Sequence, residues 1–371
     1  MNRTRRALIG SAAASVAAAG CLGVVGSSSD RACPATVSED VDARIGLVGD
    51  VMLGRGVDER WREGPPTGIW GSMLDRVRSL DGLFLNLECC LSARGSPRPG
   101  RTYHFRADPG WAVPALCSGG VVWASLGNNH VLDFGPDAFS DTLEHLSTGG
   151  IAHAGAGPDL DAALEPSLVE VGGLSVAVVA FTDRSPSYGA GSDSPGTAFV
   201  RMEPGNPRTR RLVDRALGRA RAADPDLVVA SLHWGPNWET RPARSQRRFA
   251  RGLVDRGVDV VHGHSAHVIQ GVEVYRGRPI LYDCGDFVDD YAVKPELHND
   301  RSFLFELVVD GGVVTALRLV PVEIVGEAAD RAGEAASRWL RRQMRTLSAE
   351  FGTTIERAGD GLRVPLDDCG S

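Results

Sequence analysis

Several features are scarce in this chain of 371 residues, and each scarcity excludes a class of protein. Lysine occurs once, at Lys294, and every other basic residue is arginine. The formal net charge is −7, so a nucleic-acid partner is disfavoured on electrostatic grounds. Beyond the first 21 residues no apolar run is long enough to cross a membrane. The seven cysteines include no C-x-x-C pair, so no zinc or redox motif of that kind is indicated.

The N-terminal segment, residues 1–21, has the composition of an export signal. Paired arginines precede a short run of alanine, serine and valine that ends at Cys21. The arginine pair indicates the twin-arginine route, and the residues before Cys21 resemble a lipobox, in which that cysteine is lipidated. We expect a cleaved signal, a polar tether over residues 22–43, and a lipid that anchors the exported protein at the outer face of the cytoplasmic membrane. The alternative is a single membrane-spanning anchor, for which the apolar run is short.

The rest of the chain has the pattern of an α/β protein. Short apolar runs predict buried strands over residues 44–50, 83–87, 121–126, 227–232 and 258–261. Helical patterns alternate with these strands, which indicates parallel pairing, and later hairpins over residues 168–181, 271–282 and 303–320 add antiparallel strands. We expect two mixed sheets packed face to face with helices outside. A charged helix over residues 329–347 and a polar tail are expected to end the fold.

Polar side chains follow the predicted strands at the point where each strand ends. The residues concerned are Asp50, Glu88, Asn129, His130, His233, His264 and His267. Because the carboxyl ends of parallel strands meet at one edge of a sheet, these groups are predicted to share one pocket. Carboxylate, amide and imidazole ligands suit a divalent ion such as Zn, Mn, Fe or Co, and such ions support hydrolysis of substrates near neutral pH. His262 is expected to be a hydrogen-bonded strand residue and not a ligand.

The motifs at these strand ends occur in a defined order along the chain. They are GDVMLGR (residues 49–55), NLE (86–88), NNHVLDFG (128–135), HWG (233–235), GHSAH (263–267) and YDCGDF (282–287). The set resembles the CapA family, which is linked to poly-γ-glutamate capsule synthesis. CapA-like domains are similar to the calcineurin-like metallophosphoesterases, a four-layer α/β/β/α sandwich. The resemblance covers residues 44–325 and leaves residues 326–371 as the C-terminal helix and tail.

The resemblance implies a role for each strand-end residue. It implies Asp50, Glu88, Asn129, His233, His264 and His267 as ligands of one or two ions, with Glu88 at the bridging position. His130 would then protonate the leaving group; the other reading of His130 is that it only caps its loop.

This sequence also departs from the metallophosphoesterase pattern. Met52 stands where a second ligand, a histidine, is expected, and thioether is a poor ligand for a hard divalent ion. Asp283 and Asp286 add negative charge near the predicted site.

Two functions from different classes remain open. The first is a cell-surface metal-dependent hydrolase that acts on an anionic polymer such as poly-γ-glutamate, with Arg55 and Tyr282 as candidates for orienting the substrate. The second is a non-catalytic partner of polymer synthesis or export, beside a polymer synthase, in which a degenerate metal site binds polymer. Metal content and turnover of the purified protein discriminate between them.

Overall fold

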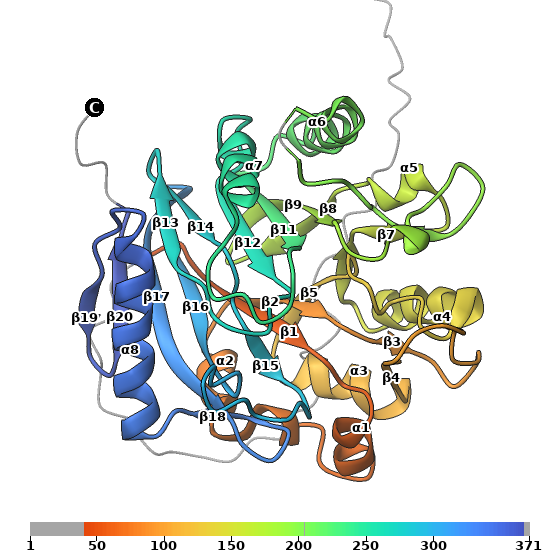
Figure 1. Ribbon diagram of the computed structural model, residues 1–371, viewed down its shortest axis with the longest axis horizontal. Helices are drawn as coiled ribbons and strands as arrows, with labels where there is room; N and C mark the ends of the chain where they lie inside the picture. The colour runs from red at the N-terminus through yellow and green to blue at the C-terminus, as the bar shows by residue number, and fades with distance from the viewer. Residues whose placement is uncertain (1–40, 204, 367–371) are drawn as a thin grey trace, which may run out of the picture.

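A computed structural model of the chain describes residues 41–203 and 205–366. Two large sheets lie face to face, and helices cover the outer faces (Figure 1). The signal segment, Cys21 and most of the expected tether lie outside the described residues. Within the described residues no helix is both long and apolar enough to span a membrane.

The first sheet has ten strands and carries the N-terminal half of the site. Its main path runs in the order β19 (Glu356–Ala358), β20 (Gly361–Pro365), β17 (Val313–Ile324), β16 (Arg301–Asp310), β1 (Ala43–Val51), β2 (Gly82–Leu87), β5 (Val121–Ser125) and β6 (Ala152–Ala154). Off this path, β15 (Asp286–Val288) pairs with β1 and β18 (Ala329–Arg331) pairs with β17. The strands β15, β1, β2, β5 and β6 are mutually parallel, so their carboxyl ends lie along one edge.

The second sheet has six strands and carries the other half of the site. Its order is β13 (Val272–Tyr275), β14 (Arg278–Leu281), β12 (Val260–His264), β11 (Leu227–His233), β9 (Leu174–Thr182) and β8 (Ser167–Val171). The four central strands are parallel, and β8 and β13 close the edges as antiparallel hairpin partners. Two short ladders complete the strands, β7 (Ala156–Gly157) with β10 (Gly196–Thr197) and β3 (Cys90–Leu91) with β4 (Arg106–Ala107).

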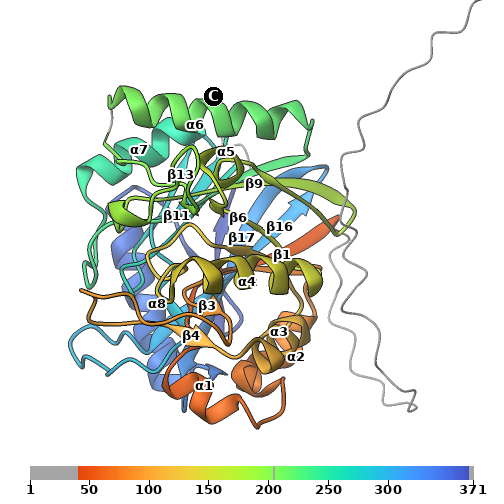
Figure 2. The ribbon, with the colours of Figure 1, turned by 90° about the vertical axis from the view of Figure 1, so that its right-hand side faces the viewer.

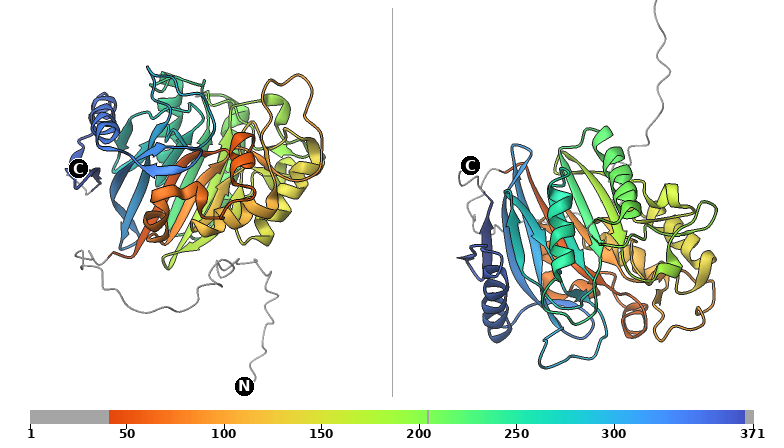
Figure 3. Two further views of the ribbon diagram at one scale, coloured as in Figure 1. Left: turned by 90° about the horizontal axis from the view of Figure 1, so that it is seen from below. Right: turned by 45° about the horizontal axis from the view of Figure 1, so that its top comes forward.

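Helices cover both outer faces of the sandwich (Figure 2). The first sheet is covered by α1 (Gly56–Trp61), η2 (Gly68–Met73), α2 (Leu74–Arg78), α3 (Pro109–Ser118) and α4 (Gly135–Thr148). The second sheet is covered by α6 (Pro207–Ala222) and α7 (Arg244–Val254), while α5 (Leu160–Ala163) and η3 (Pro186–Tyr188) are short. The last helix, α8 (Glu334–Ala349), lies along one edge of the sandwich (Figure 3) and contacts strands of both sheets.

Three separate apolar cores hold these four layers together. In β9, Val176 and Val178 point into the core between the sheets, while Ala177 and Val179 point into the core beneath α6 and α7. This alternation follows from the two-residue period of a strand and explains why the buried strands read as continuous apolar runs. A third core lies between the first sheet and its helices. The expected α/β/β/α sandwich with two mixed sheets is therefore confirmed.

The C-terminal segment differs from its expected form. The predicted helix over residues 329–347 begins only at Glu334, after the short strand β18. The segment expected as a polar tail adds β19 and β20 to the first sheet, and β20 pairs with β17. Leu362 and Val364 enter the core between the sheets. Only a few apolar residues alternate with polar ones here, so the alternating segment was too short to be recognised as a strand from the sequence.

Candidate metal centre and the cavity above it

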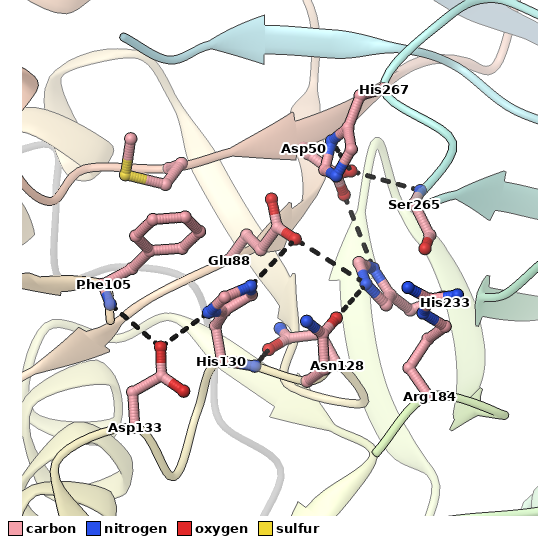
Figure 4. Close-up of polar contacts among 12 residues, drawn as sticks. Asp50, Glu88, Phe105, Asn128, His130, Asp133, Arg184, His233, Ser265 and His267 are labelled. Carbon is pink, nitrogen blue, oxygen red and sulfur yellow. Dashed lines mark hydrogen bonds and ion pairs between the residues drawn. The ribbon is translucent and has the colours of Figure 1, made fainter. Parts of the chain in front are cut away.

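The register of the strands places the predicted ligands beside one another. His233 at the end of β11 is the direct partner of His264 at the end of β12. Near the end of β1, Asp50 is the direct partner of Asp286, the first residue of β15. Glu88 immediately follows β2, the other neighbour of β1. The ends of both sheets therefore bring their polar groups to one place, as the sequence predicted (Figure 4).

Asp50, His233 and His264 form a first group of potential ligand atoms. One atom of each residue lies within 4.8 Å of the others. Asp50 Oδ1 is 3.7 Å from His233 Nδ1 and 3.4 Å from His264 Nδ1. The two imidazole nitrogens are 3.0 Å apart. One carboxylate and two imidazoles at such spacing are a donor set that suits a mid-transition divalent ion.

Asp50, Glu88, His267 and Asp286 form a second group, again with ligand atoms within 4.8 Å of one another. Asp50 Oδ2 and Asp286 Oδ1 lie 3.3 Å and 2.8 Å from His267 Nδ1. The carboxylate common to the two groups is that of Asp50, and the bridging position that the resemblance implied for Glu88 stays a prediction. Asp286 was expected only to add charge nearby, and its place inside this group is a finding of the structure.

Asn129 and Met52 occupy different positions relative to these groups. Asn129 Oδ1 lies 2.6 Å from His233 Nε2, so the amide oxygen is at the site, as expected. Glu88 Oε1 is 3.7 Å from the same His233 nitrogen. Met52 is buried, and its Sδ accepts a hydrogen bond from the Gly54 backbone N–H at 3.1 Å. The Met52 sulfur is thus engaged with the backbone of its own loop, and His267 and Asp286 supply ligand atoms in the second group.

Buried neighbours fix the orientation of the first carboxylate. Asn86 Nδ2 donates to Asp50 Oδ1 at 2.7 Å, and the Ser265 backbone N–H donates to Asp50 Oδ2 at 3.1 Å. Asn128 Nδ2 in turn donates to Asn86 Oδ1 at 3.1 Å. No role was predicted for Asn86 or Asn128 from the sequence, although both lie within the quoted motifs. Such groups behind the ligands hold them in position, which supports a rigid site.

The electrostatics of the second group are those of a crowded set of buried charges. Burial, followed by the charge of Asp50, raises the pKa of Glu88 well above its usual value. Burial also acts to raise the pKa of Asp50, but hydrogen bonds from three histidines hold that pKa well below its usual value. For His267 burial acts to lower the pKa, yet the charges of Asp286 and Glu88 raise it well above its usual value. Without a cation, protons have to balance these carboxylates.

A divalent cation fits this set of donors. Asp286 Oδ2 and Asp289 Oδ2 are both buried, and unless these two neighbouring carboxyl groups share a proton neither has a hydrogen-bond partner in the described structure. Three buried carboxylates face one another with a single imidazole between them, and buried charges of one sign are costly unless they are paired or bind a metal. Burial lowers the pKa of His233 to about 3, so its imidazole is neutral and able to act as a ligand at neutral pH.

His130 stands beside the ligands without belonging to either group. Its Nδ1 lies 2.6 Å from Asp133 Oδ2, and its Nε2 lies 3.8 Å from Glu88 Oε1. The ring stacks on Phe105 with 4.0 Å between centroids. Burial lowers the pKa of His130, an effect that outweighs the opposing influence of Asp133. Because a carboxylate can only accept, Nδ1 carries the ring hydrogen, and Nε2 is directed at the site.

Asp133 is itself held by several donors. The Phe105 backbone N–H donates to Asp133 Oδ2 at 2.9 Å, and the Tyr188 hydroxyl donates to Oδ1 at 3.0 Å. Arg101 Nε lies 3.1 Å from Oδ1. A carboxylate fixed in this way positions the His130 ring, a role that was not predicted for it from the sequence.

A cavity of about 480 Å³ lies above these residues. Its lining includes His130 and His267 from the site itself, together with Arg55, for which the substrate-binding role stays a prediction. Tyr282 is different. It is fully buried, its hydroxyl donates to Glu273, and its ring stacks on Trp234. A side chain enclosed in this way cannot contact substrate, so the substrate-binding role expected for Tyr282 is wrong.

Two further features lie near the site, one of them predicted from the sequence. His262 is buried within β12, with Nε2 2.8 Å from the Val48 carbonyl oxygen and Nδ1 3.3 Å from Ser231 Oγ. The strand role predicted for it is confirmed. Cys89 and Cys90 are buried and form no disulfide, and burial raises the pKa of both thiols. Packing is therefore the role that the structure supports for this pair.

Comparison with known proteins places the chain in a described family. The profile named “Bacterial capsule synthesis protein PGA_cap” matches residues 44–291. The chain is 32% identical over 361 residues to a “Probable polyglutamine synthesis accessory protein” of Mycobacterium tuberculosis, covering 85% of this chain and 94% of that protein. It is 30% identical over 258 residues to the “PGA biosynthesis protein CapA” of Bacillus subtilis, covering 69% of this chain and 65% of that protein.

A further relative and one solved structure complete the comparison. The “Capsule biosynthesis protein CapA” of Bacillus anthracis is 26% identical over 268 residues, covering 70% of this chain and 63% of that protein. The match thus spans just under two thirds of the length of either CapA protein. The crystal structure of TT1561 of Thermus thermophilus aligns with a TM-score of 0.41 at 10% identity, covering 71% of this chain and 93% of that one, which is too low a likeness to support an argument.

Proposed function

Because the chain belongs to the bacterial capsule synthesis protein family PGA_cap, we propose that it acts in the synthesis of an anionic envelope polymer. The names of its relatives refer to polyglutamine synthesis, PGA biosynthesis and capsule biosynthesis. The polymer proposed is poly-γ-glutamate or a chemically related chain. The reaction proposed is its metal-dependent hydrolysis.

The observation that carries this proposal is the pair of ligand groups that share Asp50 beneath an open cavity. Asp50, Glu88, His233, His264, His267 and Asp286, with Asn129 beside them, would hold one or two ions of Mn, Zn, Fe or Co. A bound divalent ion would polarise the scissile bond and make water a nucleophile near neutral pH. The cavity would admit a substrate segment to the same place, since His130 and His267 form part of its lining.

The proton transfer is proposed to use His130. In the neutral ring Nδ1–H donates to Asp133, which leaves Nε2 directed at the site. His130 Nε2 would therefore accept a proton from the attacking water and pass it to the leaving group. Asp133 would stabilise the imidazolium that forms between the two transfers, and Phe105 would keep the ring in its plane by stacking.

The second candidate is a non-catalytic polymer-binding or export partner, beside a polymer synthase. The observation that favours it is Met52, which takes the position of an expected histidine ligand and whose Sδ accepts from the Gly54 N–H. A degenerate centre of this kind could bind a cation and polymer without turnover. The word “accessory” in the name of the Mycobacterium tuberculosis relative is compatible with such a role.

One experiment distinguishes the two candidates. The full-length chain is purified, its metal content is measured, and γ-linked glutamate polymer is incubated with it while Mn, Zn, Fe and Co are supplied in turn. The hydrolase predicts bound divalent ion and release of shorter chains. His264→Ala should lose the ion of the first group, and with it the release of shorter chains. Bound polymer with no cleavage under any of the four ions would reject the hydrolase and favour the scaffold.

Location at the cell surface is proposed from the N-terminal sequence. The twin-arginine-like segment and Cys21 would export the protein and anchor it by lipid at the outer face of the cytoplasmic membrane. Mass spectrometry of the mature N-terminal peptide tests this proposal. A diacylglyceryl group on Cys21 is expected, and an unmodified cysteine or an intact signal would contradict it.

A further inference from the structure

The single lysine of the chain lies at the cavity above the candidate metal centre. Lys294 is part of the lining, and its Nζ lies 4.7 Å from the centroid of the Trp238 ring. Its backbone N–H donates to Asn299 Oδ1 at 2.7 Å, which holds the segment in place. No carboxylate of the described residues forms an ion pair with Lys294. Lys294 is thus a cation of the cavity lining that has no ion-pair partner among the described residues.

Arg55 is the other basic side chain of the lining apart from the histidines, and its charge is already neutralised. Its guanidinium forms an ion pair with Asp290, another lining residue, through both Nε and Nη2. Arg55 also lies over the rings of Phe105 and Tyr291, with 5.0 Å and 5.4 Å to their centroids. Lys294 is therefore the lining cation whose charge remains available to a ligand.

The backbone at this cavity has unusual conformations. Three lining residues other than glycine have positive φ angles, namely Arg55 at 53°, Trp238 at 70° and His267 at 59°. The Trp238 backbone N–H donates to the Ala266 carbonyl oxygen at 2.8 Å, so this conformation is held by the loop that carries His267. Backbone conformations of this kind persist only where surrounding contacts enforce them. They are common at ligand-binding sites. The position of Trp238 relative to the loop that carries His267 is therefore fixed by a backbone hydrogen bond, and Lys294 contacts the Trp238 ring.

We propose that Lys294 and Trp238 form a substrate subsite in this cavity that binds a carboxylate of the polymer. This inference rests on the proposed function and identifies the carboxylate as the substrate group that the cavity recognises. A carboxylate carries one charge, which the single ammonium group of Lys294 can match, whereas a phosphate monoester carries about two at neutral pH. The aromatic wall would pack against the methylene groups of each repeat.

Binding by a fluorescent γ-linked glutamate oligomer tests the subsite directly. The full-length chain with its metal is titrated and compared with Lys294→Gln, Lys294→Arg and a remote control, Arg208→Gln on α6. We expect about five- to tenfold weaker binding for Lys294→Gln, because one partly exposed charge-assisted contact is lost. Lys294→Arg should restore most of the affinity, and Arg208→Gln should bind as the native chain does. Metal content should be equal in all four proteins.

Because Lys294 is the only lysine, its occupancy can also be read chemically. An amine-acylating reagent modifies this side chain, and mass spectrometry of the peptide that contains it gives the extent of reaction. Saturating oligoglutamate should protect Lys294 from acylation, whereas neutral polyglutamine of equal length and inorganic phosphate should not. Protection by phosphate alone would overturn the assignment to carboxylate.

The outcomes separate this inference from the proposed function. If Lys294→Gln binds the oligomer as tightly as the native chain, and the native chain still holds metal and cleaves polymer, the subsite is rejected and the function stands. If the native chain binds metal but no glutamate oligomer, the subsite and the choice of polymer are both rejected. If the native chain binds oligomer but no metal, and Lys294→Gln still loses affinity, the subsite stands while the hydrolase falls.

Discussion

Replacement of Asp50 by asparagine should disrupt both ligand groups, but to different degrees. The substitution keeps the shape of the side chain and removes the charge that the two groups share. The first group is left with His233 and His264 and no carboxylate, whereas the second keeps Glu88 and Asp286. Removal of one partner from a buried charge pair costs about 3–5 kcal/mol. At about 1.4 kcal/mol per tenfold, this corresponds to a loss of roughly two to three and a half orders of magnitude in affinity at the first group.

Calorimetric titration of the metal-free native and Asp50→Asn proteins measures this difference, and metal analysis after dialysis checks the stoichiometry. We expect the variant to lose the ion held by the first group and to bind an ion at the second group with reduced affinity. Asp290→Asn is the matched control, because Asp290 is a carboxylate of the cavity that belongs to neither group. Circular dichroism confirms that each variant is folded. Native stoichiometry and affinity in Asp50→Asn would refute the assignment of a shared carboxylate.

Three further predictions follow from the same contacts. Asp133→Asn should lower kcat about 10- to 100-fold with metal content unchanged, because His130 loses the carboxylate that orients its ring. Steady-state kinetics measure kcat, and an unchanged value would show that Asp133 has no part in the mechanism. The raised pKa of Glu88 means that the metal-free protein loses stability as pH rises above the ordinary value of 4.5, when the buried carboxyl must ionise. The gap in Tm between metal-loaded and metal-free protein should therefore widen with rising pH in scanning calorimetry, and a narrowing gap would count against a cation beside Glu88. Tyr282→Phe should lower the free energy of unfolding by about 1 kcal/mol in a denaturant titration, because Glu273 loses a hydrogen-bond donor. An increase in KM would instead show that Tyr282 contacts the substrate.

The sequence was sufficient to predict most of the fold and most of the ligands, and for one physical reason. A buried parallel strand is an apolar run, and the polar residue that ends it must lie at the edge where ligands bind. Asp50, Glu88, His233 and His264 could all be placed by this rule, since each ends or follows such a run. The three hairpins were equally visible because glycine-containing turns separate their apolar strands.

Other features depend on contacts between segments that are distant in the chain. Asp286 enters the second ligand group through β15, a strand of three residues whose pairing with β1 has no local signature. Tyr282 follows a strand and lies within a site motif, yet its side chain points into the core beneath α7. Lys294 drew attention only as an isolated lysine, because its place at the cavity is set by the packing of its loop beside Trp238.

The claim on which the account depends is that side chains from both sheets gather around a shared cation. Crystals of the full-length chain soaked in Mn²⁺ and measured at a wavelength with strong manganese anomalous scattering test it most directly. An anomalous peak is expected within coordinating distance of a carboxylate oxygen of Asp50 and of imidazole nitrogens of His233 and His264. Occupied manganese elsewhere on the protein, with no peak between these three side chains, would contradict it.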